Sequence, residues 1–165
     1  MDELFTGYYQ SPIGMICIQC NRQAVVRLHF VKHPDEEAIV QPLAGSPPVL
    51  KQALEQVAQY FEGRRQSFDV PVDLSGSPYY IKVWRELMHI PYGTTCSYGA
   101  LAAAVGNAKA ARAVGLANNR NPVSIIVPCH RVIGANGTLV GYGGGLHRKQ
   151  WLLDWEKSHT FVGLF

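Results

Sequence analysis

The chain of 165 residues is 47% hydrophobic and only 16% charged, a composition that excludes a disordered chain and can fill one large core or two small ones. Residues 1–74 carry a net charge of −3, from six Lys/Arg and nine Asp/Glu, whereas residues 75–165 carry +6, from nine Lys/Arg and three Asp/Glu. Because the N-terminus is acidic and no apolar run approaches membrane-spanning length, we expect a soluble cytoplasmic protein without a secretory signal or a membrane segment.

The first part of the chain has the pattern of a β-meander followed by a helix. Short strand-like runs, separated by turn-forming residues, cover residues 4–9, 15–20 and 24–31. Apolar residues at helical spacing then predict a helix over 50–61. The segment Phe68–Leu74 alternates between polar and apolar residues and predicts a returning strand. These elements predict a small α+β domain over residues 1–74, in which no chemistry is visible.

The segment Ser75–Pro78 reads as a linker into a second domain, 75–165, that is mostly helical. A first helix is expected over 81–88. Ser97 can cap a second, short helix, and after a Gly-Asn turn a third helix is expected at about 109–119. Two short helices joined by a Gly-containing turn are typical of a helix-turn-helix.

The last of these helices begins Lys109-Ala110-Ala111-Arg112. Small side chains would let it approach a partner's backbone closely and present the arginine, although an Ala-rich helix is also typical of a buried bundle. No acidic residue lies between Leu87 and Leu153. The cations of this stretch are Lys109, Arg112, Arg120, Arg131, Arg148 and Lys149. Such a pattern attracts a polyanion such as nucleic acid, unless acidic residues from elsewhere in the fold neutralise it.

The segment Ile125–Val132 carries the most reactive chemistry in the sequence. It presents Cys129 behind a proline, followed directly by His130. Thiols react as thiolates, and a neighbouring imidazole favours that form, so the local chemistry fits a nucleophile. A Cys-His pair on its own is more often a buried structural cysteine. A metal site is not expected, because Cys17 and Cys20 have CxxC spacing but no matching second pair.

The string Pro128-Cys129-His130-Arg131-Val132 resembles the active-site signature of the O6-alkylguanine-DNA alkyltransferases. Further segments resemble this family in its own order and spacing: Val83-Trp84, Ile90-Pro91-Tyr92-Gly93, Ser97-Tyr98, Ala110-Ala111-Arg112-Ala113-Val114-Gly115, Asn121-Pro122 and Gly141-Tyr142-Gly143-Gly144-Gly145. The resemblance runs without visible gaps from about Phe68 to Lys157 and is looser before it, where Ser11–Gly14 carries it. It implies a ribonuclease-H-like first domain and a stand-alone, bacterial-type protein that needs neither a cofactor nor zinc.

The activity that this resemblance implies is DNA repair. The alkyl group of O6-alkylguanine, or of O4-alkylthymine, would pass irreversibly to Cys129, in one turnover per molecule. His130 would act as base on the thiol through a water, and Glu156 would orient the imidazole. Asn121 would tie its turn to the active-site segment. Tyr98 would supply a proton or a hydrogen bond to the leaving base.

The resemblance further implies double-stranded DNA as the partner, bound through the minor groove by a monomer associated with the nucleoid, with cooperative binding left open. The damaged base would rotate out of the stack, and Arg112 would fill the space it leaves. Ala110 and Ala111 would allow the close approach of the helix. Further DNA contacts would come from Lys109, Arg120 and Arg131. The base pocket would be lined by Asn118, Val132, Tyr142 and Gly143, with Tyr142 as its lid.

The sequence departs from the family at the expected pocket. Position 143 is Gly, where some members carry Ser, which suggests a roomier pocket that accepts groups larger than methyl. Asn118 and Asn119 stand where other members carry bulkier residues, so the substrate range is left open. Two other functions remain as alternatives, a lesion-binding module without catalysis and a Cys-His hydrolase. The retained Cys129 and His130 argue against the first, and the sequence shows no oxyanion hole for the second.

Overall fold

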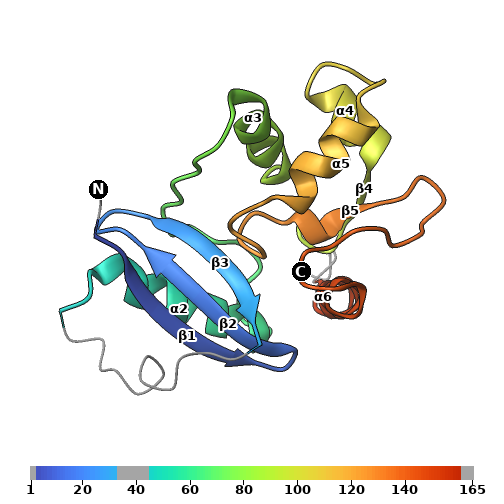
Figure 1. The fold of residues 1–165 in the computed structure, drawn as a ribbon. Coiled ribbons are helices and arrows are strands. Elements are labelled where there is room, and N and C mark those ends of the chain that lie inside the picture. Colours follow the sequence, from blue (N-terminus) through green and yellow to red (C-terminus); the bar gives the residue numbers. More distant parts are fainter. Residues whose placement is uncertain (1–2, 33–44, 161–165) are drawn as a thin grey trace. The chain divides into compact units, whose positions relative to one another are not determined.

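A computed structural model describes residues 3–32 and 45–160 of the chain (Figure 1). The chain divides into two compact units, Met1–Ser75 and Gly76–Phe165. The first is built on a small β-sheet, and the second is mostly helical. The predicted α+β order of a sheet domain followed by a helical domain is therefore confirmed.

Over its described residues, 3–32 and 45–75, the first unit has a three-stranded antiparallel sheet with one helix packed against it (Figure 1). Its strands, in spatial order, are β1 (Phe5–Ser11), β2 (Gly14–Cys20) and β3 (Val25–Val31), and its helix is α2 (Pro48–Phe61). The core between sheet and helix has fully buried side chains from both, namely Ile16, Ile18, Leu28, Leu50, Ala53 and Val57. Each predicted strand of the meander and the predicted helix are present, with ends that differ by one or two residues.

The predicted strand Phe68–Leu74 is wrong in its extent. Only Val72 forms a bridge, parallel to Val25 of β3. Two amides of this segment donate instead to the side-chain Oε1 of Gln56 in α2, at 3.2 and 3.3 Å. Pro71 has no amide hydrogen to add to a ladder. The segment therefore follows the helix surface and touches the sheet at one point.

The second unit contains four α-helices, one 3-10 turn and a short parallel pair of strands among its described residues. They are α3 (Pro78–Leu87), β4 (Cys96–Ser97), α4 (Tyr98–Ala104), α5 (Ala111–Asn119), η1 (Cys129–Arg131), β5 (Val132–Ile133) and α6 (Leu146–Ser158). Helices α3, α4 and α5 pack against one another. Trp84 of α3 donates its indole N–H to the carbonyl of Ala117 in α5 at 2.8 Å, in a buried contact that joins these helices.

The predicted helix-turn-helix pair is α4 and α5. The Ser97 hydroxyl caps α4 by accepting the amide hydrogen of the residue three positions on, at 3.0 Å. Helix α5 begins at Ala111, two residues later than expected. The Asn107 side chain accepts the amide hydrogen of Lys109, and the Asn107 carbonyl accepts that of Ala110, both at 3.0 Å. These bonds form a turn, so Lys109 and Ala110 lead into the helix rather than belong to it.

The pairing of β4 with β5 brings distant parts of the second unit together. Cys96 lies opposite Val132, and Ser97 lies opposite Ile133. Because β5 directly follows η1 and β4 directly precedes α4, the turn that carries Cys129 lies beside the start of the helix-turn-helix.

Candidate active site

Cys129 stands at the start of η1 and is only 4% exposed. The loop before it is held from within by the Asn121 side chain, which donates to the Val127 carbonyl at 2.8 Å and accepts the amide hydrogen of Val123 at 3.0 Å. Ile125 in this loop has φ 72°, a left-handed conformation that is strained for a β-branched residue. The hydrogen bonds of Asn121 therefore help to hold this strained backbone conformation four residues before the cysteine.

The environment of the thiol is buried and polar. Burial raises the pKa of Cys129 above its ordinary value, while the Asn121 side chain and the ammonium of Lys149 act in the opposite direction. Asn118 of α5 donates from Nδ2 to the Cys129 carbonyl at 3.2 Å. The thiol thus stays protonated at neutral pH unless a base removes its proton, and its backbone is tied to the end of α5.

Two side chains and one backbone amide surround a buried carboxylate. Glu156 and His130 are fully buried, with His130 Nε2 2.7 Å from Glu156 Oε2. Arg131 donates to the same carboxylate from Nε at 2.8 Å and from Nη2 at 3.0 Å. Its Nη1 donates to the Ile90 carbonyl at 2.6 Å, and the Gly93 amide donates to Glu156 Oε1 at 3.3 Å. One carboxylate from α6 thereby anchors η1.

The protonation states of this network follow from its geometry. Burial by itself would raise the pKa of Glu156, but the hydrogen bond from His130 and the ion pair with Arg131 outweigh burial and hold that pKa well below its usual range. Burial lowers the pKa of His130 in spite of the carboxylate. The neutral imidazole therefore donates Nε2–H to Glu156, which assigns the lone pair to Nδ1. In the described part of the chain, this buried Nδ1 has no hydrogen-bond partner.

Residues 140–145, which we call the lid, lie between β5 and α6. The Tyr98 hydroxyl donates to the Val140 carbonyl at 2.8 Å, and Lys149 Nζ donates to the same carbonyl at 3.0 Å. Tyr142 has a buried hydroxyl. Burial and the nearby Cys129 raise the pKa of both tyrosines, so both phenols remain protonated donors.

The lid touches the end of α5. Gly141 has φ +60°, and a Cβ at this position would come within 2.9 Å of the Asn119 side chain. A Cβ on Gly143 would meet nothing nearer than the Asn119 carbonyl at 3.9 Å. Of the other residues expected in the base pocket, Val132 and Asn118 are buried. A Cβ therefore fits at position 143 with one ordinary van der Waals contact, whereas at position 141 it would collide with Asn119.

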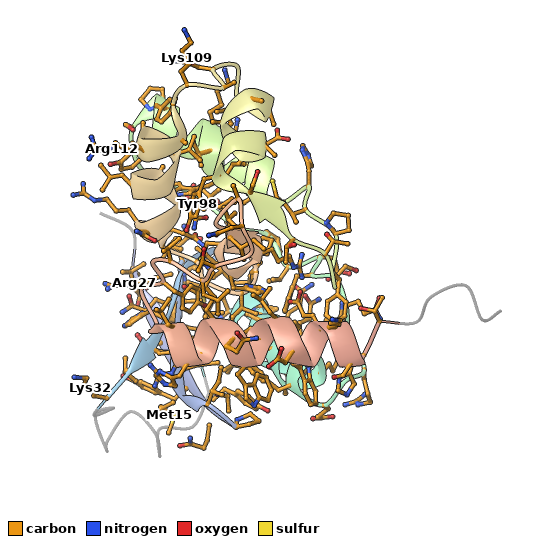
Figure 2. All side chains as sticks on the ribbon, turned by 90° about the vertical axis from the view of Figure 1, so that its right-hand side faces the viewer. Met15, Arg27, Lys32, Tyr98, Lys109 and Arg112 are labelled. Carbon is orange, nitrogen blue, oxygen red and sulfur yellow. The ribbon has the colours of Figure 1, made fainter. Side chains whose placement is uncertain are left out.

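The residues expected to face DNA lie mostly on the surface. Lys109, Arg112 and Arg120 are exposed, and none of them forms an ion pair with an acidic residue in the described structure. Figure 2 shows Lys109 and Arg112 projecting outward from the end of the second unit, with Tyr98 lying further inward. Ala110 and Ala111 are half-buried at the start of α5. This end of the helix-turn-helix is therefore positively charged.

Two family models match the chain. The DNA binding domain of 6-O-methylguanine DNA methyltransferase matches residues 78–158, and the ribonuclease-like domain of the same protein matches residues 4–74. The chain belongs to the 6-O-methylguanine DNA methyltransferase family. The resemblance noted in the sequence, including the ribonuclease-like nature of the first domain, is thereby confirmed.

Relatives of known name cover nearly the whole chain. A methylated-DNA–protein-cysteine methyltransferase of Mycolicibacterium paratuberculosis is 47% identical over 154 residues, which are 93% of each chain. One of Methanosarcina acetivorans is 43% identical over 155 residues, 94% of this chain and 99% of the relative. A crystal structure of Mycobacterium tuberculosis OGT in complex with DNA superposes with a TM-score of 0.82 at 42% identity and covers 95% of each chain.

Within this family domain, Arg131 does not lie where the sequence led us to expect it. The expectation was a DNA contact, but Arg131 is only 6% exposed, and the described hydrogen bonds of its side chain go to Glu156 and to the Ile90 carbonyl. A guanidinium so engaged cannot reach a phosphate without leaving a buried carboxylate unpaired. Arg131 therefore belongs to the network that holds η1, and its burial contradicts the DNA contact expected from the sequence.

The residue that sequence reasoning missed is Lys149, which was counted only among the cations of a basic stretch. It is fully buried. The buried residues of α6 are Lys149, Leu152 and Glu156. Their spacing of three and four positions places them on one helix face, so the helical period from the apolar Leu152 could have indicated that both charged residues point inward.

Neither a metal centre nor a membrane helix emerges from the described residues. Over residues 3–32 and 45–160, no three His, Cys, Asp or Glu side chains gather closely enough to hold a metal ion. No helix there is both long enough and apolar enough to cross a bilayer.

Proposed function

We propose that this protein removes the alkyl group from O6-alkylguanine in DNA and transfers it irreversibly to its own Cys129. The observation that carries the proposal is a buried Cys129 next to a buried His130 that Glu156 holds at Nε2, while the imidazole Nδ1 has no hydrogen-bond partner among the described residues. Relatives at 43–47% identity are named methylated-DNA–protein-cysteine methyltransferases, which supports both the donor and the acceptor of the transfer.

Activation of the thiol is the first step of the proposed reaction. Because burial raises the pKa of Cys129, the thiol needs a base. His130 accepts the thiol proton at Nδ1 through a bridging water. Glu156 keeps Nε2–H oriented and stabilises the imidazolium that forms, as carboxylates do for catalytic histidines.

Transfer is an in-line displacement at the alkyl carbon. The Cys129 sulfur forms the new carbon–sulfur bond while the bond between the alkyl carbon and guanine O6 breaks, and its electron pair stays on the base. The product thioether is chemically stable, so each protein molecule acts once. The proton that His130 took from the thiol ends on the departing guanine, so His130 returns to the neutral imidazole and the site ends neutral.

The departing guanine carries developing negative charge, for which Tyr98 is the proposed donor. Burial and the neighbouring Cys129 raise the pKa of Tyr98, so its phenol keeps its proton while the base leaves. A donor that is already in place lowers the barrier of such a step because it needs no reorganisation. Tyr98 stands at the first residue of α4, beside the β4–β5 pair that adjoins η1.

Double-stranded DNA is the proposed substrate, bound by α5 in the minor groove. The damaged base must leave the stack, because inside a duplex its O6 substituent cannot reach a buried thiol. Arg112 fills the vacated space, and the small side chains of Ala110 and Ala111 admit the DNA backbone. Lys109 and Arg120 supply phosphate contacts. The related structure solved with DNA supports this kind of partner.

The proposed substrate range extends beyond O6-methylguanine. A Cβ on Gly143 would meet only the Asn119 carbonyl, at 3.9 Å, and from this room we infer that the pocket accepts groups larger than methyl. O4-alkylthymine offers the same alkyl–oxygen bond on a base ring, so we include it among the substrates.

Stoichiometry of transfer tests the proposal. Duplex DNA with a radiolabelled O6-methylguanine, in excess over protein, should transfer label to the protein until it reaches one methyl per chain. Cys129→Ala should take up no label and still bind DNA, because phosphate contacts dominate affinity. Cys96→Ala, which removes a half-buried thiol nearby, is the matched control and should keep the full stoichiometry. Lesion binding without label on the wild-type protein would instead indicate a module that only recognises damage.

A further inference from the structure

One carbonyl in the lid accepts hydrogen bonds from two residues of the expected active site. Val140 O lies 2.8 Å from the Tyr98 hydroxyl and 3.0 Å from Lys149 Nζ. Lys149 Nζ also donates to the Gly141 carbonyl at 3.3 Å. The ammonium lies 5.8 Å from the centre of the Tyr98 ring, in cation–π range. Tyr98, from α4, and Lys149, from α6, thus meet on the lid.

The burial of Lys149 calls for an explanation. Its side chain has no exposed surface, and no carboxylate among the described residues forms an ion pair with it. Burying a cation without a counterion is unfavourable by several kcal/mol, as an order of magnitude. An anion formed during the reaction can act as the missing partner. The thiolate of Cys129 is such an anion, and the two groups interact electrostatically.

The donors of the two side chains can be counted. A lysine ammonium has three N–H groups, and Lys149 uses two of them on the lid carbonyls, so one remains. A tyrosine has a single O–H, which Tyr98 donates to Val140. If Tyr98 donates to the leaving base, it must first release Val140. Lys149 can keep its hold on the lid throughout.

The lid must also move for a base to enter. Cys129 is only 4% exposed, so an alkyl carbon cannot reach its sulfur while the surrounding segments keep these positions. The first turn of α6 holds the lid at both ends, because Lys149 binds Val140 and Gly141 while Arg148 Nη1 donates to the Gly144 carbonyl at 2.9 Å. The Tyr98 bond comes from a different element, α4, and is the one whose release frees a donor for the substrate.

We propose that Tyr98 and Lys149 form a latch on the Val140 carbonyl, and that Lys149 is a positioning residue for the transfer reaction. In the free protein both residues hold the lid closed over Cys129. When the extruded base enters, Tyr98 exchanges Val140 for the base, while Lys149 retains the lid and directs its third N–H at the thiolate. This inference rests on the proposed function, because it assigns the exchange to the substrate of that reaction.

The first test uses the free protein and needs no DNA. The pH midpoint of Cys129 carbamidomethylation by iodoacetamide, which reaches the sulfur when the lid opens transiently, reports thiolate formation. The groups that interact electrostatically with this thiol are Tyr98, Tyr142 and Lys149, and the adjacent His130 is bonded to Glu156. Lys149→Met should move the midpoint upward by about one pH unit, which is a tenfold loss of thiolate at a given pH. Lys149→Arg should restore it, and Lys157→Met, at an exposed position on the same helix, should leave it unchanged.

The second test follows the lid itself. Backbone 15N relaxation of Gly141, Gly143 and Gly144 should show greater mobility in Lys149→Met and in Tyr98→Phe than in the wild type, while Lys157→Met should match the wild type. Unchanged glycine mobility in both Lys149→Met and Tyr98→Phe, or an unchanged carbamidomethylation midpoint in Lys149→Met, would overturn the latch. Burial of a methionine in place of a lysine is tolerated in a folded core, and the remaining amide signals check the fold.

The two proposals can fail separately. Failure of the wild-type protein to take up a methyl group from lesion DNA would refute the proposed function, whatever the lid does. Normal transfer by the wild type together with unaltered lid mobility in the variants would refute the latch alone. In the supporting case, Lys149→Met also transfers methyl about tenfold more slowly at neutral pH, in proportion to its lost thiolate.

Discussion

The Nε2 atom of His130 lies 2.7 Å from Oε2 of Glu156, and neither side chain is exposed to solvent. The same carboxylate accepts two hydrogen bonds from Arg131. Glu156 thereby fixes the direction of the imidazole beside Cys129 and also joins α6 to η1. A single substitution at this carboxylate should therefore affect both chemistry and stability.

Glu156→Gln should lower the free energy of unfolding by about 3–5 kcal/mol, because it leaves the buried Arg131 without its counterion. Urea denaturation measures the change. Asp154→Asn is the matched control, since Asp154 is exposed on the same helix and is hydrogen-bonded only to Gln150 among the bonds described. The control should change stability by less than about 0.5 kcal/mol. Equal stabilities of the two variants would contradict the role of Glu156.

Acid should destabilise the protein through the same network. The pKa of Glu156 is held well below its usual value, so below about pH 4.3 the unfolded chain binds a proton that the native state does not. The lowered pKa of His130 acts in the same direction from about pH 6.5 downward. The free energy of unfolding should therefore fall as pH is lowered from 7 to 4. Denaturation at several pH values checks this, and a slope that Glu156→Gln leaves unaltered would count against it.

Arg112→Ala should slow alkyl transfer from duplex DNA but not from a single-stranded oligonucleotide that carries the same lesion. The reason is that only a duplex has a stack whose vacated space the guanidinium can fill. Single-turnover transfer rates on the two substrates measure the effect. Arg85→Ala removes another exposed arginine, from α3, and should change the transfer rate on neither substrate. If the transfer rate fell by the same factor on both substrates, Arg112 would act only through a phosphate contact.

Gly143→Ser should fold with a stability within about 0.5 kcal/mol of the wild type, because nothing but a carbonyl at 3.9 Å faces the new side chain. It should also slow transfer of a benzyl group more than transfer of a methyl group, since it narrows the space beside the lid. Gly141→Ser is the contrasting variant. Because the backbone there has a φ of +60°, any side chain should lower the free energy of unfolding by about 1 kcal/mol. If Gly143→Ser slowed the transfer of both alkyl groups equally, position 143 would not determine which alkyl groups the protein accepts.

Much of the fold follows from local pattern. The Ser97 cap, the Gly-Asn turn and the apolar period of 50–61 each predict an element that the structure contains. The family signature around Cys129 likewise pointed to the correct family. The strand expected at Phe68–Leu74 is wrong because a side chain from α2, Gln56, takes the amides that a ladder needs. The local sequence pattern of 68–74 does not show that a side chain from another element binds these amides.

The site was less predictable where burial decides the role of a charge. Arg131 and Lys149 read as basic surface in the sequence, but both are buried. The partner of Arg131 lies 25 positions away in α6, and only tertiary structure brings it near. The partners of Lys149 are backbone carbonyls, which no sequence pattern marks. The roles assigned to Cys129 and to the residues around it remain predictions.

Transfer to Cys129 is tested most directly by peptide mass after incubation with duplex DNA that carries one O6-methylguanine. The peptide containing Cys129 should gain the mass of one CH2 unit, the lesion should become guanine, and excess DNA should add nothing more. An unmodified Cys129 peptide, or a methyl group on Cys17, Cys20 or Cys96 instead, would contradict the proposed transfer.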